Sequence, residues 1–344
     1  MTSRSPLLLL TVARLKLFFR EPSAVFWSFG FPILLSIALG IAFRDKPPEP
    51  IAAAVQAGPG AERVVASLEA SGQVKARPLE ADAAKSALRT GKVAIVVRPG
   101  ATRTYAFDPT RPESRLARTV VDDLLQRADG RVDPTPVAEA KLTEPGSRYI
   151  DFLLPGLIGL NIMSSGMWGI GYVIVEDRTR KLLKRMLAMP MKRSHFLLSF
   201  VFMRVLFLAI ELPVLMLFGW LAFSITIRGS LLLLGLIALL GAFAFAGLGL
   251  LVASRARNTQ TVGGLMNLVM MPMYVLSGVF FSSANFPEPM QPFIKALPLT
   301  ALNDGMRAVI NEGAGFAAVA PQAGILAATA LVTFVAAVKL FRWS

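Results

Sequence analysis

Six long apolar segments restrict the fold of this chain more than any other feature of its sequence. A bilayer core of about 30 Å needs roughly 20 apolar residues at the rise of an α-helix. Segments of this kind lie near 24–43, 149–175, 197–223, 230–253, 259–281 and 317–340. The sequence therefore predicts an all-α polytopic membrane protein with six transmembrane helices. The first segment exceeds the apolar core of a signal peptide and no small-residue cleavage site follows it, so we expect a retained anchor.

Lysine and arginine residues indicate how these segments cross the bilayer. Basic residues near the ends of spans favour the cytosolic side. With a cytosolic N-terminus, that side would hold Arg4, Arg14, Lys16, Arg20, the Arg178–Arg193 cluster, Arg255, Arg257, Lys339 and Arg342. The short outer connections would hold only Arg228, Lys295 and Arg307. We therefore expect both termini in the cytosol.

The composition narrows the class of partner. The net charge of +14 could indicate nucleic-acid binding, but the basic residues flank apolar segments and form no stripe with interleaved aromatic residues. Anionic membrane lipid is the better match, and we expect no nucleic-acid partner. The chain has no cysteine, which excludes disulfides and thiolate metal sites.

A basic and apolar stretch, Leu7 to Pro22, precedes the first span. As a helix, it would direct its arginine and lysine side chains to lipid headgroups and its leucine and phenylalanine side chains into the acyl boundary. We expect an interfacial elbow helix that ends at Pro22. The alternative is an ordinary basic flank of a membrane anchor. Residues 1–44 would then form the elbow helix and the first span.

Residues 45–147 differ from the rest in composition and are bounded by Pro- and Gly-containing linkers. Within them, IAAAVQA, QVKARPL, KVAIVVRP and TRTYAFDP are typical of strands. The segments AERVVASLEA, ADAAKSALRTG and PESRLARTVVDDLLQRA are typical of helices. The alternation predicts a small inserted α/β domain, which the expected topology places outside the cytosol.

Several kinds of catalytic site are hard to build from this chain. The only Gly-Lys pair, Gly91-Lys92, is followed by Val93 and lacks the earlier glycine of a phosphate-binding loop. The single histidine, His195, lies at the start of a span, where a boundary role is commoner than base catalysis. The adjacent pairs Asp122-Asp123 and Glu176-Asp177 point in different directions on a helix. An intramembrane enzyme would therefore lack its catalytic groups.

A charged loop, Glu176 to Phe196, joins the second and third spans. Leu182, Leu183, Met186 and Leu187 recur at helical spacing among basic residues, and Pro190 follows them. One reading is a basic cytosolic loop whose apolar side rests on the membrane. The other is a helix that inserts its leucines into a groove on a cytosolic partner.

Two sets of residues give the chain a family resemblance. The first set is Glu176, Leu182, Lys184, Met186, Leu187 and Pro190, followed by Lys192-Arg193-Ser194. The second set is Ser277-Gly278, Phe286-Pro287, Pro298-Leu299-Thr300 and Asp304-Gly305-x-Arg307. In these motifs the chain resembles the ABC-2 type permeases, the membrane subunits of ATP-binding cassette exporters, in their long form. The usual Gly-Thr of the family is replaced by Arg180-Lys181, so we expect a different turn at the start of the coupling helix.

The resemblance implies roles for particular residues. A cytosolic coupling helix over 176–192 would contact an ATPase subunit through Glu176, Asp177, Arg178, Leu182, Leu183, Lys184, Arg185, Leu187 and Pro190. An outer gate would include Phe286, Pro287, Pro298, Thr300, Asp304 and Arg307. Prolines within 282–312 exclude one straight helix, so short broken helices at the outer face are expected. A proline-rich surface loop is the alternative. Residues 148–344 would form the five-helix region that carries these parts.

Polar residues inside the spans form a further set of candidates. Glu211 lies mid-span, where a carboxylate needs a partner, water or a proton. Arg204 lies two turns toward the cytosol; it could snorkel, or pair with Glu211 through water, because direct contact needs both side chains extended. Glu211, Arg204 and Asn267 could line a substrate path or a subunit interface. Alternatively, a neutral Glu211 could bond a neighbouring helix. Met266, Met270, Met271 and Met273 fit plain helix packing or a polyspecific path.

The resemblance also implies a function. It suggests a permease subunit in the bacterial inner membrane that exports an amphipathic substrate such as a drug, a lipid or a glycolipid-like molecule. ATP and Mg would be bound by a separate ATPase subunit, and this chain would bind no cofactor or metal and would not be an enzyme. It would pair with a second copy or a paralogue, most simply as a homodimer. The alternative is a membrane-anchored scaffold or sensor whose outer domain binds a ligand without transport.

Overall fold

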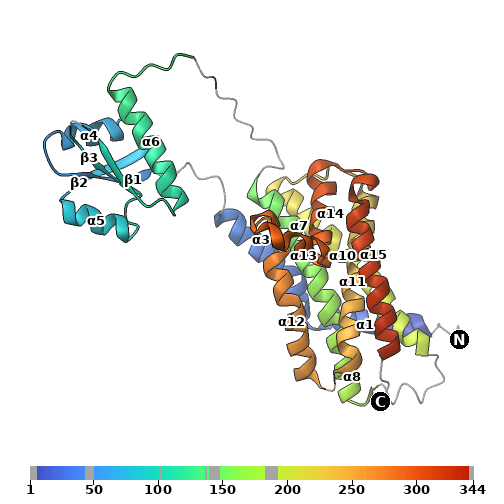
Figure 1. Cartoon of the computed structure of the whole chain (residues 1–344). Helices are drawn as coiled ribbons and strands as arrows, with labels where there is room; N and C mark the ends of the chain where they lie inside the picture. Colours follow the sequence, from blue (N-terminus) through green and yellow to red (C-terminus); the bar gives the residue numbers. More distant parts are fainter. Residues whose placement is uncertain are drawn as a thin grey trace. The chain divides into compact units, whose positions relative to one another are not determined.

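The computed structural model describes residues 6–42, 50–100, 102–135, 138, 148–182, 193–256 and 258–340. The chain divides into two compact units (Figure 1). A helical unit comprises Met1–Arg44 and Thr143–Ser344, and a smaller unit comprises Asp45–Leu142. Each unit has its own buried apolar core.

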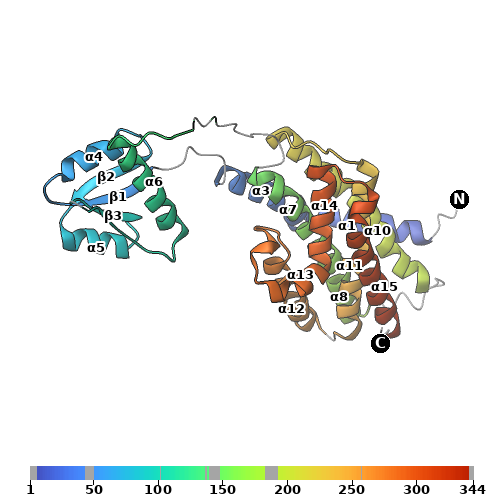
Figure 2. The same ribbon diagram turned by 45° about the horizontal axis from the view of Figure 1, so that its top comes forward.

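The helical unit begins with a helix that breaks before the first span. Helix α1 (Pro6–Arg20) ends just ahead of Pro22, whose ring cannot continue a helix from the preceding turn. The chain then continues through α2 (Pro22–Val25), the π-helix η1 (Phe26–Gly30) and α3 (Phe31–Ala42). Helix α1 packs beside α10 (Arg193–Phe223) (Figure 2). The helix predicted over Leu7–Pro22 therefore exists, and its position at a membrane surface remains a prediction.

The other long helices follow the domain insertion. Helix α7 (Tyr149–Gly166) continues through the π-helix η2 (Met167–Tyr172) into α8 (Val173–Thr179). After α10 come α11 (Leu231–Arg255), α12 (Thr259–Leu276) and, at the end of the chain, α15 (Phe316–Leu340). Helices α11 and α15 have the most extensive mutual packing.

Five helices of the described chain are long and apolar enough to cross a membrane. They cover Pro22–Ala42, Tyr149–Thr179, Ser199–Phe223, Leu231–Arg255 and Phe316–Leu340. Five of the six predicted spans are thereby supported. The sixth was expected over 259–281, but α12 stops at Leu276 because Gly278 adopts a left-handed conformation, φ 68°, just beyond it. A sixth crossing by α12 remains a prediction.

Glycines allow the central helices to approach closely. A Cβ on Gly171 of η2 would lie 2.5 Å from the carbonyl oxygen of Gly249 on α11. A Cβ on Gly249 would in turn lie 3.0 Å from the Cα of Met167. Backbone contacts this close need small residues, as is common between membrane helices. Gly171 and Gly249 therefore lie at a close crossing of η2 and α11.

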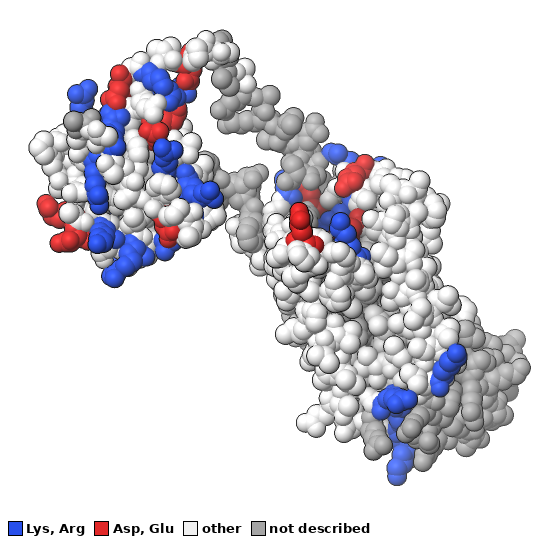
Figure 3. Space-filling model, in the orientation of Figure 1, with Lys and Arg blue, Asp and Glu red and all other residues white. Residues whose placement is uncertain are grey.

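The surface of the helical unit matches an apolar surrounding. Space-filling atoms show charged side chains gathered toward the two ends, with an uncharged belt between them on the visible face (Figure 3). Large apolar side chains of the helical unit are widely exposed, including Leu232 at 87% and Leu268 at 70%. An exposed apolar surface of this extent is expected of a protein that contacts lipid.

The smaller unit is a four-stranded sheet with helices on both faces. Its elements are β1 (Ile51–Gln56), α4 (Ala61–Glu69), β2 (Val74–Leu79), α5 (Ala81–Arg89), β3 (Ile95–Arg98), β4 (Thr104–Phe107) and α6 (Pro112–Ala128). The strand order is β2-β1-β3-β4; β1 pairs parallel with β2 and β3, and β4 is antiparallel to β3. All four predicted strands and all three predicted helices are present.

Alternating side chains explain how this sheet is covered. On β1, Ala53 and Val55 face the core under α4 and α6, whereas Ala54 faces the smaller core under α5. On β3, Val97 and Val96 divide in the same way. Figure 2 shows α4 and α6 on one face and α5 on the other. A strand covered on both faces needs apolar residues at consecutive positions, which is the pattern of these two strands.

The segment between α12 and α15 is broken into short pieces. It contains the 3-10 turns η3 (Ser283–Asn285) and η4 (Glu288–Met290), then α13 (Gln291–Ala296) and α14 (Pro298–Glu312). Pro298 occupies the first turn of α14, where a missing N–H costs nothing. The prediction of broken helices over 282–312 is therefore right about the interruptions, although α14 continues for 15 residues.

Candidate functional site

A buried ion pair lies on α10 inside the helical unit. Arg204 Nη1 is 3.2 Å from Glu211 Oε2, and the two residues are 3% and 0% exposed. A second guanidinium nitrogen, Nη2, donates to the carbonyl oxygen of Ile162 on α7 at 3.1 Å. The contact is direct, so the expected bridging water is not required. Glu211 pairs within its own helix, and Arg204 makes the link to the neighbouring helix.

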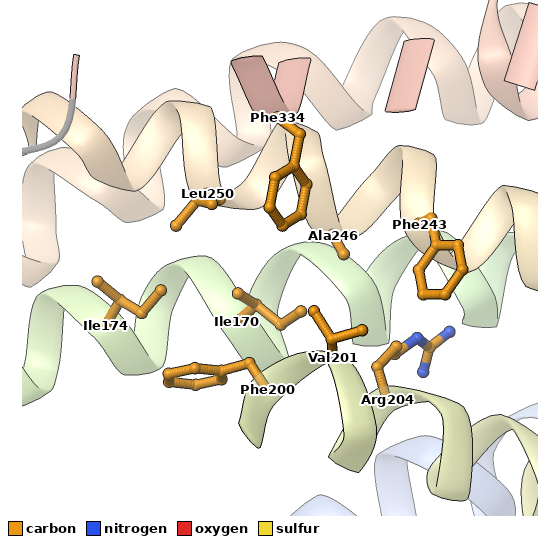
Figure 4. Close-up of a pocket in the computed structure, with 9 residues that line it drawn as sticks. All are labelled: Ile170, Ile174, Phe200, Val201, Arg204, Phe243, Ala246, Leu250 and Phe334. Atoms are coloured by element: carbon orange, nitrogen blue, oxygen red, sulfur yellow. The ribbon is translucent and has the colours of Figure 1, made fainter. Parts of the chain in front are cut away.

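The ion pair adjoins a small cavity. Its volume is about 20 Å³, room for roughly one water molecule. The lining residues come from η2, α8, α10, α11 and α15 (Figure 4): Ile170, Ile174, Phe200, Val201, Arg204, Phe243, Ala246, Leu250 and Phe334. Arg204 Nε and Glu211 Oε1 find no hydrogen-bond partner among the described residues. The pair is thus deeply desolvated and incompletely bonded, a costly arrangement unless the bonds are completed in another way.

The structure separates Asn267 from this pair. Asn267 is exposed on α12, whereas Arg204 and Glu211 are covered within a single chain. Met266, Met270 and Met273 are buried and pack in the core, while Met271 is 61% exposed. A role of Glu211, Arg204 and Asn267 in a path or an interface remains a prediction.

The end of α8 contacts α1 and the end of α11 directly, and it is linked to α10 through Arg14 of α1. Asp177 Oδ2 lies 3.8 Å from Arg14 Nη2 of α1. The Arg14 guanidinium in turn lies 3.6 Å from the ring centre of Phe200 on α10. Arg178 Nη1 donates to the carbonyl oxygens of Ala253 and Ala256, at 3.1 Å and 2.9 Å, at the C-terminal end of α11. We name Arg14, Asp177, Arg178 and Phe200 the α8 clamp.

Arg14 has a different position from the one expected. As part of a basic face it should point to headgroups, yet its side chain is only 12% exposed. Burial lowers the pKa of Arg14 to about 10, and the nearby Asp177 opposes that shift. The guanidinium therefore stays charged at neutral pH. Phe18, one turn further along α1, stacks edge-on with Phe207 of α10, so the Arg14 face of this helix is the packed face.

The loop that follows α8 is described only at its start. Glu176 pairs with Arg180 at 2.7 Å, and Lys181 adopts a positive φ of 55°. Leu182 is half-buried. The remaining predicted coupling residues, Leu183, Lys184, Arg185, Leu187 and Pro190, lie outside the described residues, and so does most of the predicted coupling helix 176–192. The side chain of His195 is likewise not described.

A second polar cluster joins α14 to α7 and to the segment after α12. Arg307 Nε donates to the carbonyl oxygen of Phe152 at 3.1 Å, and its Nη2 donates to that of Gly278. The guanidinium also lies 3.6 Å from the centre of the Phe152 ring. Asn303 Nδ2 donates to the carbonyl oxygen of Ser277 at 3.0 Å. These bonds satisfy backbone oxygens where α7 starts and where α12 has ended.

Burial shifts the pKa values of two charged side chains in this cluster. Burial lowers the pKa of Arg307 to about 10, opposed by Asp304, whose carboxylate lies 3.8 Å away. The same burial raises the pKa of Asp304, and Arg307 opposes that shift. Thr300 is buried, and its hydroxyl has no partner among the described residues. The other predicted gate residues differ in exposure: Pro298 is buried, Phe286 is half-buried against Phe281, and Pro287 is exposed.

The buried ion pair and the polar cluster of Arg307 lie within a segment that matches a known protein family. The sequence model of the family described as "ABC-2 family transporter protein" matches residues 22–339, which include α8, α10 and the whole segment from α12 to α15. The chain belongs to the ABC-2 transporter family. Permeases of this family work with ATP-binding cassette partners, and their membrane subunits lack an ATPase site of their own.

Three named proteins are among the relatives of this ABC-2 chain. It is 27% identical over 173 residues to the inner membrane transport permease YhhJ of Escherichia coli, covering 50% of this chain and 46% of that protein. It is 24% identical over 204 residues to ABC transporter G family member 20 of Dictyostelium discoideum, covering 59% and 28% respectively. It is 23% identical over 279 residues to the linearmycin resistance permease protein LnrN of Bacillus subtilis, covering 77% and 67%. The chain thus spans less than half the length of the first two.

The structure brings together two pairs of the residues that the sequence pattern singled out, and it adds others. Asp304 and Arg307 contact each other, as do Arg204 and Glu211. The sequence did not predict that Asn303 belongs to the polar cluster of Arg307 or that Arg14 belongs to the α8 clamp. Asn303 lies between the recognised Thr300 and Asp304 and offers no distinctive spacing. The burial of Arg14 could have been inferred from Phe18, which follows it by one helical turn.

Proposed function

We propose that this chain is the permease subunit of an ATP-binding cassette exporter. The observation that carries the proposal is the family match over residues 22–339. The substrate would be amphipathic: a drug, a lipid or a glycolipid-like molecule. The Bacillus subtilis relative is named for linearmycin resistance, and removal of a harmful compound fits that class. ATP and Mg would be bound by the partner ATPase, with both termini of this chain in the cytosol and residues 45–147 outside it.

The α8 clamp supports a way to transmit work from the partner. If ATPase closure displaces the segment after Glu176, Asp177 and Arg178 move with it. Asp177 contacts Arg14 of α1, and Arg178 holds the end of α11. The push would then reach α1 and α11 directly, and α10 through the contact of Arg14 with Phe200. The helical spans would tilt as a group and open the path.

A second copy would complete the path in this proposal. Ser164 and Tyr274 share a hydrogen bond of 3.2 Å between α7 and α12, and Asn267 is exposed on α12. Polar side chains at membrane depth normally face protein or a watery cavity. The face formed by α7, η2 and α12 would therefore meet the same face of a second permease, with the path between them.

The test is co-expression of this chain with an ATP-binding cassette ATPase subunit from the same organism, followed by reconstitution into liposomes. Changing Leu183→Asp and Leu187→Asp should abolish ATPase binding and ATP-driven substrate movement, because apolar anchors would become charged. The matched control is Leu116→Asp, an exposed leucine of the α/β unit, 61% exposed, which should change neither. Complex formation and transport that survive both leucine changes would contradict the proposal.

A further inference from the structure

A groove of about 610 Å³ runs along the outside of α15. It is lined by Leu240 of α11 and, along α15, by Ala327, Ala330, Leu331, Val335 and Lys339. Leu331, Val335 and Lys339 follow one another at intervals of four residues and so share one face of the helix. Alanines at 327 and 330 leave the hollow between the larger side chains. Every lining side chain apart from that of Lys339 is apolar.

The dimensions of this groove match one leaflet of a bilayer. The twelve residue-to-residue steps from Ala327 to Lys339 rise about 18 Å at 1.5 Å per residue. Half of a hydrocarbon core of about 30 Å is roughly 15 Å. The groove therefore extends from the charged end of α15 to about the middle of the membrane, which is the reach of one acyl chain.

Positive charge lies at the surface end of the groove. Lys339 is exposed in the last turn of α15. Gly247 of α11 lies against Thr333 of α15, and eight more residues along α11 bring Arg255 to the depth of that last turn. Arg255 is exposed as well. Two basic side chains at this depth complement an anionic headgroup.

We propose that this groove binds one acyl chain of an anionic phospholipid of the leaflet on the Lys339 side, with its headgroup phosphate at Lys339 and Arg255. A transmembrane helix is a poorer occupant. With a diameter of about 10 Å, it would fill roughly 1,400 Å³ over the same 18 Å, more than twice the volume available. A neutral phospholipid would fill the groove but would leave the two basic side chains without a net negative partner.

The bound chain would lie next to the ion pair of α10. Phe334 lines both this groove and the small cavity beside Arg204. In Figure 4 its ring extends from α15 toward the α10 side chains. The Phe334 ring thus forms the partition between the lipid site and the buried charge. The site depends on membrane embedding alone and not on the ATPase partner proposed above.

Native mass spectrometry of the full-length protein tests the site. The protein is reconstituted in equal parts of phosphatidylglycerol and phosphatidylcholine, extracted in detergent, and the retained lipids are counted. Wild type should keep phosphatidylglycerol in preference to phosphatidylcholine. Ala330→Phe fills the groove and should remove this lipid. Ala328→Phe, an exposed alanine outside the lining, is the control and should retain it.

A second variant tests the headgroup without altering the core. Lys339→Gln should lower the preference for phosphatidylglycerol about fivefold, the effect of one basic side chain near an anionic surface. Lys295→Gln, on α13, should leave the preference unchanged. Equal retention of the two lipids by wild type, or equal retention by Ala330→Phe and Ala328→Phe, would overturn the proposal. A change in the monomer to dimer ratio with Ala330→Phe and unchanged lipid would assign the groove to a second copy and overturn it too.

Discussion

Arg204 and Glu211 pose a problem of desolvation that their mutual contact only partly solves. The pair is buried, and one atom of each side chain lacks a partner in the described part of the protein. Removing one member of such a pair leaves a buried charge uncompensated, which typically costs about 3–5 kcal/mol. Arg204→Met and Glu211→Leu should therefore each lower thermal stability in detergent strongly. The double variant should recover most of the loss, because an apolar pair of similar volume has no charge to desolvate.

A double-mutant cycle tests whether Arg204 and Glu211 stabilise the protein through their mutual contact. The unfolding midpoint is measured for wild type, both single variants and the double variant. Glu211→Gln is the milder companion change, since its amide still accepts a bond from Arg204. If the double variant is as unstable as the sum of the single ones, the two side chains act independently and the ion pair is not the source of the stability. Export measured on the double variant then reports whether the charges serve transport.

Individual residues were only partly predictable from the sequence. A carboxylate within an apolar run is conspicuous, so Glu211 and its neighbour Arg204 could be recognised. Arg14 was placed at the headgroups because a basic residue on an amphipathic helix usually lies there. Its true position depends on Phe200 and Asp177, which are far away in the sequence and come close only in the folded chain. Asn303 likewise could not be recognised from the sequence, because its hydrogen bond to the carbonyl oxygen of Ser277 forms only in the folded chain.

Helix crossings depend on single glycines. A Cβ at Gly171 would meet the backbone of Gly249 at 2.5 Å and also the side chain of Met266. Backbone cannot yield as a flexible side chain can, so Gly171→Ala should separate η2 from α11 and destabilise the protein by about 1–3 kcal/mol. Gly235→Ala on α11 is the control, because nothing lies within 4 Å of its Cβ. There the loss of glycine flexibility should stabilise by about 0.5–1 kcal/mol.

Thermal unfolding of the purified variants in one detergent measures both changes. Equal midpoints for Gly171→Ala and Gly235→Ala would show that the crossing adjusts to an added methyl group. The result would also bear on the π-helix, since η2 is the segment that brings Gly171 to α11. A π-helical turn of this kind often marks a place where a helix serves more than packing.

Elements of secondary structure were more predictable than their interruptions. The short apolar runs of β1 and β3 and the apolar periodicity of α4 and α6 gave a local signal for each. The π-helices η1 and η2 have no such signal, because they arise where packing shifts a helical turn. The end of α12 was placed too late, since apolar residues continue past Leu276 while the backbone has already turned at Gly278.

The α/β unit should have its own dependence on pH. Hydrogen bonds from Arg127 and then Arg131 lower the pKa of Asp123, and bonds from Thr110 lower that of Asp108. A carboxyl group with a lowered pKa in the folded state stabilises above its unfolded pKa of about 4 and loses that contribution as pH falls. Residues 45–142, produced alone, should unfold cooperatively and at a lower temperature at pH 3 than at pH 6. Asp123→Asn should weaken this dependence, whereas Asp82→Asn on α5 should preserve it.

At the scale of the whole molecule, two units of different composition share one chain. The helical unit carries the buried ion pair, the α8 clamp and the polar cluster of Arg307, while the α/β unit carries its own core on both faces of a sheet. The division was visible in the sequence because Pro- and Gly-containing segments flank a stretch with few apolar runs. The sequence did not indicate what each unit contributes to transport. Contacts with a partner chain produce no periodic sequence pattern from which such a contribution could be predicted.

Removal of the α/β unit separates the permease proposal from the scaffold or sensor alternative. If this chain is a permease as proposed, energy would enter through the loop after Glu176 and pass along the α8 clamp. Replacing residues 50–135 with a Gly/Ser linker should then preserve ATPase binding and ATP hydrolysis by the complex. Lys184→Glu with Arg185→Glu should abolish both, because the charges that set the register of the loop are reversed. A sensor would show the reverse: loss of function on deletion and no effect of the charge reversal. Pull-down of the ATPase and its ATP turnover in liposomes measure both variants, and the reverse pattern would leave transport by this chain without support.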